Sequence, residues 1–246
     1  MYRTQGRVTF SQSRGDGNMS IPSMMYFMQD CVNLHARDIG RGLEYLDEKR
    51  RLWAITCWNM RILRRPHAGE RIVAGTYSSG VRSMLANREF VIESESGESL
   101  AIANSQWIYM DMDTRKPTRI REDDMLGYEL GEPLEGIDKP SHKIIFPDGE
   151  WEDMGQIPIL RHFLDVNGHL NNISYVFLAM EYIPREFEIT DFKTVYKKES
   201  YQGDKVYAKM LQIGDEYYFD FVDDEGDSRF SAYFRGYKLE EVRELK

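Results

Sequence analysis

The chain has 246 residues, 41% of them hydrophobic and 30% charged, with a formal net charge of −9. This length allows one large domain or two small ones with a sizeable buried core. No segment approaches the roughly 20 apolar residues that span a membrane, and the negative charge argues against nucleic acid as a partner. The N-terminal residues resemble neither a signal peptide nor a transit segment, so we expect a cytoplasmic protein.

The two cysteines, Cys31 and Cys57, are too few for a disulfide framework and lack metal-ligand spacing. Each lies in an apolar stretch, and free cysteines are usually buried. We therefore expect both to be core residues, and the sequence predicts neither a metal site nor a cofactor.

The first half of the chain predicts a strand, a long helix and four further strands. The strand-like pattern begins directly after the N-terminus. Ser20 is a good N-cap and Pro22 suits the first helical turn, and apolar residues then recur at helical spacing until Gly40 ends the helix. Residues 41–51 are predicted to be extra loop residues. Strand-like runs follow at 53–63, 71–79, 84–93 and 100–110.

The second half predicts a similar order with a shorter helix. Residues 113–156 show no sustained periodicity and indicate a linker between the halves. A helix is predicted at 172–182, ending before Pro184. Strand-like runs follow at 187–198, 205–213, 216–222 and 229–237.

The two halves also match each other in sequence at three places, in the same order. The matching segments begin at Ser20 and Asn172, surround Gly69 and Gly203, and surround Gly97 and Gly226. Such a repeat indicates a duplicated unit. The sequence therefore predicts the α+β class, with the apolar face of one helix packed against an antiparallel sheet in each half.

Asp165, Asn167 and His169 alternate along the chain of the second half. In an extended segment this spacing puts the three side chains on one side. The good N-caps Asn171 and Asn172 follow, so amides at a helix start would point toward the same place and stabilise developing negative charge. Taken alone, however, the cluster is more readily explained as a capped turn.

The repeat favours a functional interpretation of this cluster. The matching first-half segment, residues 15–20, has no histidine and a different spacing. Glu199, at the end of a second-half strand, is matched by Arg65, which has the opposite charge. A solvated glutamate is the ordinary interpretation of Glu199, but these contrasts are what one working site and one retired copy would show.

Two runs of the second half resemble the motifs of a known family. Asp-Val-Asn-Gly-His-Leu-Asn-Asn at 165–172 and Tyr-Lys-Lys-Glu-Ser at 196–200 resemble the Asp-x-Asn-x-His-x-Asn-Asn and Tyr-basic-basic-Glu-Cys motifs of acyl-(acyl carrier protein) thioesterases of the double hot-dog type. Softer matches extend the resemblance over nearly the whole chain. Plant members often carry cysteine where this chain has Ser200, so a papain-like thiol mechanism is hard to sustain here.

The resemblance implies a tandem hot-dog fold, with the catalytically retired copy and the acyl pocket at residues 1–125, a linker at 126–155 and the catalytic hot-dog at 156–246. The implied reaction is hydrolysis of the thioester of fatty acyl-acyl carrier protein, which releases free fatty acid and ends its synthesis. Water would be the nucleophile.

The resemblance also implies a role for each site residue. Glu199 would orient or deprotonate the water, with His169 as a second partner in the same network. Asn167 would hold the thioester carbonyl or its oxyanion, and Asp165 would orient Asn167 or His169. Which of Glu199 and His169 activates the water stays open.

The acyl chain would lie between helix and sheet of the first half. An apolar, adaptable lining is offered there by a methionine-rich set. Its members are Met24, Met25, Phe27, Met28 and Trp58. For several of these residues, an ordinary place in the core is the alternative.

The implied partner is acyl carrier protein carrying a fatty acyl chain on phosphopantetheine. Because this partner is acidic, an enzyme of net negative charge needs a local basic face to receive it. The candidates are Arg61, Arg64, Arg65, Arg115, Lys116, Arg119, Lys197 and Lys198. Solvated charges explain each of them at least as well, and a tandem repeat is compatible with a monomer or a homodimer.

Three alternatives stay open. An acyl-CoA thioesterase would retain the hydrolysis and change the carrier, whereas a hot-dog dehydratase would release no free thiol. A non-catalytic acyl-binding module would tolerate the loss of Asp165, Asn167, His169 and Glu199. An assay for thiol release from acyl-carrier-protein and acyl-CoA donors separates these functions.

Overall fold

Each half of the chain folds as an antiparallel sheet with one helix lying on it. The computed structural model describes residues 1–165 and 167–239, and the chain divides into two units, Met1–Pro140 and Ser141–Lys246. Val166, inside the predicted motif, and residues 240–246 lie outside the described residues. The division falls within the predicted linker. Among the described residues, no helix is long and apolar enough to cross a membrane.

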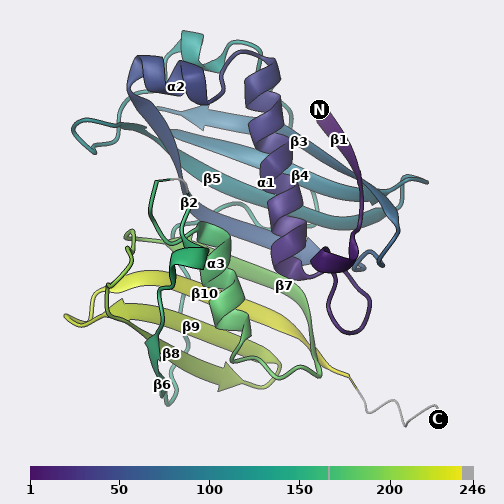
Figure 1. Ribbon diagram of the computed structural model, residues 1–246, viewed down its shortest axis with the longest axis vertical. Coiled ribbons are helices and arrows are strands. Elements are labelled where there is room, and N and C mark those ends of the chain that lie inside the picture. The colour runs from purple at the N-terminus through teal and green to yellow at the C-terminus, as the bar shows by residue number, and fades with distance from the viewer. Residues whose placement is uncertain (166, 240–246) are drawn as a thin grey trace. The chain divides into compact units, whose positions relative to one another are not determined.

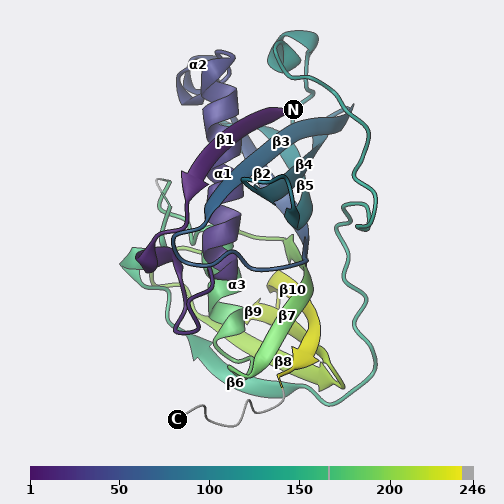
Figure 2. The ribbon, with the colours of Figure 1, turned by 90° about the vertical axis from the view of Figure 1, so that its right-hand side faces the viewer.

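The first unit forms a five-stranded sheet in the order β1-β3-β4-β5-β2, and every pairing within it is antiparallel. Figure 1 shows α1 lying across these strands, and Figure 2 shows β1 beside β3 at one edge. The elements are β1 (Tyr2–Arg7), α1 (Ile21–Asp38), α2 (Leu43–Lys49), β2 (Arg51–Ile62), β3 (Arg71–Arg82), β4 (Leu85–Ser94) and β5 (Ser99–Asp111), with 3-10 turns at Phe10–Gln12 and Glu122–Met125.

The predicted caps of the long helix are confirmed. Ser20 precedes α1, and its side chain accepts a hydrogen bond from the amide of Ser23 at 3.2 Å. The helix ends at Asp38, and Gly40 follows with a φ of 70°, a left-handed conformation that glycine adopts readily. The prediction of loop at residues 41–51 was wrong, because this segment contains the seven-residue helix α2.

The second unit forms a five-stranded antiparallel sheet in the order β7-β10-β9-β8-β6. Its helix α3 has nine residues against eighteen in α1, and lies over this sheet in Figure 1. β6 begins in what was predicted to be linker. The elements are β6 (Glu152–Ile157), α3 (Asn172–Met180), β7 (Phe187–Tyr196), β8 (Val206–Ile213), β9 (Glu216–Asp223) and β10 (Ser228–Lys238), with a 3-10 turn at Arg161–Phe163.

Aromatic side chains fill the space between α3 and its sheet. Tyr175 of α3 stacks on Phe230 of β10 with ring centroids 4.9 Å apart, and Phe221 of β9 packs against Phe230 at 5.2 Å. All three side chains are buried. Burial of such large apolar surfaces stabilises the short helix, which would be marginal by itself. The helix start, and with it the loop before the helix, is thereby held in place.

The first unit buries a polar group in the corresponding layer. His35, near the end of α1, lies 3.4 Å from the guanidinium of Arg88 on β4 and stacks on the ring of Tyr2. Both His35 and Arg88 are buried. Burial and the neighbouring Arg88 charge lower the pKa of His35 from its ordinary value of 6.5 to about 4. The imidazole is therefore neutral at pH 7.

This group makes the stability of the protein pH-dependent. Because the folded His35 takes up a proton only near pH 4 while the unfolded one does so near 6.5, its contribution to stability is complete above pH 6.5 and is lost as the pH falls to 4. Relative to His35→Gln, the wild type should lose about 3 kcal/mol of unfolding free energy between pH 7 and 4. Urea unfolding of both proteins at each pH measures this, and a constant difference would contradict it.

Candidate active site

The loop before α3 is organised by the carboxylate of Asp165. Its Oδ1 accepts hydrogen bonds from the amides of Asn167 at 2.8 Å and His169 at 3.0 Å. The amide of Asp165 in turn donates to the carbonyl of His169 at 2.7 Å. Gly168 turns the chain between them with a φ of 78°. Asp165 thus orients Asn167 and His169 through their backbone, and the side chain of Asn167 stays exposed.

A second segment, just after β7, meets this loop. His169 and Tyr201 form an isolated antiparallel bridge, and the amide of Leu170 donates to the carbonyl of Ser200 at 2.8 Å. The bridge brings Nε2 of His169 to 3.5 Å from Oε2 of Glu199. These side chains are 17% and 39% exposed, so water and a substrate can reach both. The structure thus joins residues thirty positions apart in sequence.

Tyr201 completes this group and was not selected from the sequence. Its hydroxyl donates to Oε2 of Glu199 at 2.8 Å, and its ring meets the imidazole of His169 edge-on with centroids 4.9 Å apart. The signal in the sequence is its alternation with Glu199, since alternate residues of an extended segment share a side. An aromatic residue in a strand is common enough to hide that signal.

Ser200, between these two residues, points the other way and is fully buried. Its hydroxyl accepts a hydrogen bond from the phenol of Tyr175 at 2.7 Å. Burial raises the pKa of Tyr175 to about 12, so this phenol keeps its proton and cannot serve as a base for Ser200. This environment does not suit a nucleophile that must reach a substrate carbonyl.

An arginine fixes the backbone on both sides of Ser200. Nη1 of Arg229, on β10, donates to the carbonyl of Glu199 and to Oδ2 of Asp204, both at 2.7 Å. The same Asp204 oxygen accepts from the amide of Tyr201 at 3.0 Å. Nε of Arg229 donates to the buried carboxylate of Asp223 at 3.2 Å. Arg229 therefore fixes the backbone positions of Glu199 and Tyr201. It, too, was not selected from the sequence.

The carboxylate of Asp223 is itself held in its ionised form. Burial alone would raise its pKa, but a hydrogen bond from the amide of Asp227 and the charges of Lys198 and Arg229 hold the pKa below its ordinary value. Lys198 lies 3.2 Å from this carboxylate. The network beneath the site thus keeps its charges paired over the neutral pH range.

The first unit contains the same loop with different side chains. The amide of Arg14 donates to the carbonyl of Asn18, and the amide of Met19 donates to that of Pro66, which reproduces the bonds of Asp165 and Leu170. Asn18 therefore corresponds to His169. The expectation of a different spacing was wrong: the N-cap Ser20 corresponds to the N-cap Asn171, one residue before the match assumed from sequence.

The chemistry of this first loop differs from that of the second. Arg65, in the position of Glu199, is buried and forms an ion pair of 2.7 Å with Asp16. His67 forms the backbone bridge to Asn18 that Tyr201 forms to His169. The first loop therefore offers an internal ion pair where the second has an accessible carboxylate beside an imidazole.

The predicted acyl-lining residues lie in or beside the core of the first unit. Met24, Met25 and Met28 of α1 and Trp58 of β2 are buried, and Trp58 stacks on Phe90 at 4.7 Å. Phe27 faces β1, where any side chain at Gly6 would meet its ring at 2.9 Å.

The predicted basic residues differ in exposure. Arg115, Lys116 and Arg119 are exposed in the segment after β5, and Lys197 and Lys198 are exposed just after β7. Arg61 and Arg64 are half-buried, and Arg65 is buried. Arg61 donates to the carbonyl of Gly136, Arg64 pairs with Glu70 and Glu98, Arg65 with Asp16, Lys197 with Ser228, and Lys198 with Asp223. Arg65 in particular is buried and cannot contribute to a docking surface.

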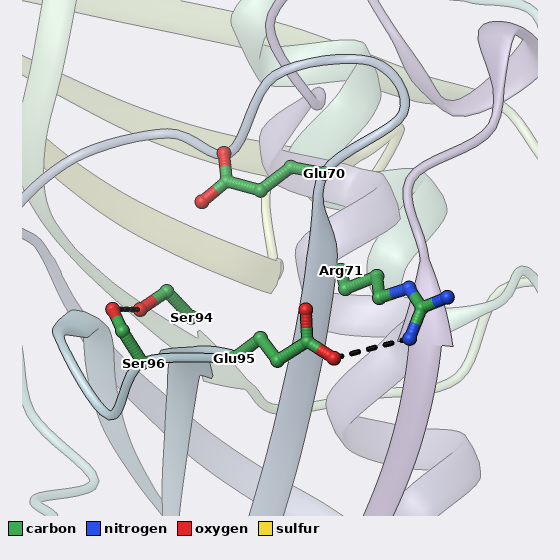
Figure 3. Close-up of a pocket in the computed structure, with 5 residues that line it drawn as sticks. All are labelled: Glu70, Arg71, Ser94, Glu95 and Ser96. Carbon is green, nitrogen blue, oxygen red and sulfur yellow. Dashed lines mark hydrogen bonds and ion pairs between the residues drawn. The ribbon is translucent and has the colours of Figure 1, made fainter.

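A surface hollow of the first unit contains none of the predicted catalytic residues. Figure 3 shows its lining, in which Arg71 pairs with Glu95 at 3.1 Å and the hydroxyls of Ser94 and Ser96 share a hydrogen bond of 2.8 Å. Within the described part of the chain, no group of three or more His, Cys, Asp or Glu could hold a metal ion. The lining of this hollow therefore does not include the His169–Glu199 group.

Comparison with known proteins decides the family. The model of the acyl-ACP thioesterase N-terminal domain matches residues 1–128, and that of the C-terminal domain matches residues 150–232. The chain belongs to the acyl-ACP thioesterase family. Within this family, the His169–Glu199 group lies in the part of the chain that matches the C-terminal domain.

Individual relatives are distant in sequence. An acyl-[acyl-carrier-protein] hydrolase (FATB3, chloroplastic) of Cuphea viscosissima is 27% identical over 199 residues, which cover 75% of this chain and 48% of the relative. Oleoyl-acyl carrier protein thioesterase 1 of Arabidopsis thaliana is 23% identical, covering 76% and 57%. The chain thus spans about half the length of the curated relatives that it matches.

Solved structures of family members share the fold. An acyl-ACP thioesterase from Bacteroides thetaiotaomicron superposes with a TM-score of 0.86 at 20% identity, covering 96% of this chain and 97% of the other. A 12:0-ACP thioesterase from Umbellularia californica gives 0.82 at 20% identity with the same coverage. The tandem hot-dog fold expected from the sequence is therefore confirmed.

Ser200 provides a test of the site's chemistry. Because its hydroxyl is buried and bonded to Tyr175, Ser200→Ala should match the wild type in a thioester-hydrolysis assay. The variant should lose about 1–2 kcal/mol of unfolding free energy, because the phenol of Tyr175 loses its acceptor. Steady-state thioester hydrolysis and urea unfolding measure the two effects. A fall in turnover on the order of 10³-fold in the folded variant would instead indicate a serine nucleophile.

Proposed function

We propose that this chain hydrolyses the thioester of fatty acyl-acyl carrier protein and releases the free fatty acid. The main support is that Nε2 of His169 lies 3.5 Å from Oε2 of Glu199, in an accessible position. The chain that holds this pair belongs to the acyl-ACP thioesterase family. A carboxylate beside an imidazole can take a proton from water and return it to a leaving thiolate. Water is the nucleophile in this proposal because Ser200 is buried.

The proposal also gives the other residues of this loop a role that fits their positions. Asp165 holds the loop closed so that His169 reaches Glu199. Asn167, whose side chain is exposed on the same loop, would hold the thioester carbonyl and its oxyanion. The division of proton transfer between Glu199 and His169 is part of the proposal, with Glu199 as the base and His169 as its partner.

The acyl chain and its carrier are assigned by the same proposal. The chain would lie against the Met24, Met25 and Met28 face of α1, beside Phe27 and Trp58. The exposed residues Arg115, Lys116 and Arg119 would receive the acidic carrier. The cytoplasmic location and the choice between monomer and homodimer stay predictions.

One assay decides between this function and its alternatives. The purified chain is incubated with acyl-acyl carrier proteins and acyl-CoAs of graded chain length, and released thiol is measured. Preferential release from the carrier-protein series is expected. Release from acyl-CoA alone would indicate an acyl-CoA thioesterase. No thiol from any donor would refute hydrolysis and leave the dehydratase or the acyl-binding module.

Removal of either member of the pair should slow catalysis strongly without unfolding the protein. Glu199→Ala and His169→Ala should each lower turnover by ~10² or more, the usual contribution of a general acid–base group. Glu186→Ala and His162→Ala, exposed residues of the same unit, serve as matched controls with unchanged turnover. Steady-state kinetics with thermal unfolding as a check decides the matter, and near-normal turnover in Glu199→Ala would remove Glu199 from the mechanism.

Docking by charge should be visible in the effect of salt. If Arg115, Lys116 and Arg119 receive an acidic carrier, kcat/KM for acyl-acyl carrier protein should fall several-fold as ionic strength rises, because salt screens surface charges. The double variant Lys116→Glu, Arg119→Glu should lower kcat/KM and flatten this dependence. An acyl-pantetheine thioester, which is uncharged, is the control substrate. The same salt response for both substrates would count against electrostatic docking.

A further inference from the structure

Tyr201 lies in the centre of the His169–Glu199 group. Its hydroxyl and Nε2 of His169 both approach the same carboxylate oxygen, Oε2 of Glu199, at 2.8 and 3.5 Å. Its ring lies edge-on against the imidazole. The side chain is 44% exposed, so it contributes little to the core of the second unit. Its contacts are therefore directed at the two proposed proton-transfer groups.

The backbone of Tyr201 is fixed from two directions. Its amide donates to Asp204, which Arg229 holds, and its bridge to His169 ties it to the loop before α3. The same Arg229 nitrogen holds the carbonyl of Glu199. The backbones of both residues that form the Tyr201–Glu199 hydrogen bond are therefore held by hydrogen bonds. This restricts where the phenol and the carboxylate can lie.

A glutamate at a strand end has several rotamers open to it, and only some bring its carboxylate to His169. A phenol keeps its proton at neutral pH and donates one hydrogen bond, which is stronger when the acceptor is ionised. We propose that Tyr201 is a positioning residue of the hydrolytic site, whose phenol holds the Glu199 carboxylate beside His169. This inference rests on the proposed function and adds a residue to it.

The first unit shows that this tyrosine is not required by the backbone. There the bridging position is His67, and the adjoining strand-end position is Arg65, which is paired with Asp16. The loop closes in the same way without a tyrosine. Tyr201 accompanies Glu199, so its role belongs to the chemistry of the second unit and not to the closure of the loop.

The test removes the hydroxyl group from each of two tyrosines of the second unit, in separate variants. Tyr201→Phe keeps the ring and loses the hydrogen bond to Glu199. Tyr218→Phe is the matched control, because its hydroxyl also donates to a glutamate, Oε2 of Glu216, at 2.7 Å. For Tyr201→Phe we expect kcat to fall about tenfold, through loss of orientation, with KM and the unfolding temperature close to those of the wild type. Tyr218→Phe should leave kcat unchanged. Equal kcat in the two variants would overturn the proposal.

A double-mutant cycle separates positioning from any independent role. If Tyr201 acts through the Glu199 carboxylate, Tyr201→Phe should cost nothing further in a Glu199→Gln background. The same tenfold loss in both backgrounds would overturn the proposal, because Tyr201 would then act elsewhere. Failure of the proposed function has a different signature, namely a wild type that releases no thiol from any donor. Thiol release by the wild type with an unaffected Tyr201→Phe would refute the inference alone.

Discussion

The antiparallel bridge between the loop before α3 and the segment after β7 is the constraint on which the site depends. Its hydrogen bond from Leu170 to Ser200 and its pairing of His169 with Tyr201 place the imidazole beside the Glu199 carboxylate. Neither partner has a regular element of its own at this point. The loop is held by the Asp165 carboxylate and the strand end by Arg229. The proposed catalytic group is thus held in place by polar contacts of loop segments. The sheet and the helix support these segments but do not contain them.

The comparison of the two units separates what the backbone needs from what chemistry needs. Both units close the loop with the same main-chain hydrogen bonds and cap the following helix with a side-chain oxygen, from Ser20 in one and Asn171 in the other. These features are conserved between the units because an open helix start would leave amides unsatisfied. The units differ in the side chains at the positions of Glu199 and Tyr201, which are Arg65 and His67 in the first unit. In the first unit the Arg65–Asp16 pair neutralises itself, whereas in the second Glu199 meets an imidazole and a phenol.

Most of the fold could be predicted because the spacing of apolar residues along the sequence shows which side of a strand or helix is buried. This spacing is clear in the long strands and in both main helices, and their predicted limits agree with the structure to within a few residues. α2 was missed because seven residues are too few to establish a period, and β6 was missed because an edge strand can be polar and its Gly155 interrupts the pattern. Asp165, His169 and Glu199 could be selected from sequence because the repeat exposed their contrast with the first half. Tyr201 and Arg229 could not, because their roles depend on a register and a cross-strand neighbour that only the three-dimensional structure supplies.

A network of paired charges is buried beneath the proposed site. Arg229 and Lys198 form ion pairs with Asp223, and Arg229 also pairs with Asp204, so these charges compensate one another. Truncating one partner of such a network leaves the others buried and unpaired, which costs more than the pair contributes. Ser200 sits among these groups with its hydroxyl bonded to Tyr175. The side chains of the proposed hydrolytic site, Glu199 and Tyr201, lie on the opposite side of the same segment and alternate with Ser200 along the chain.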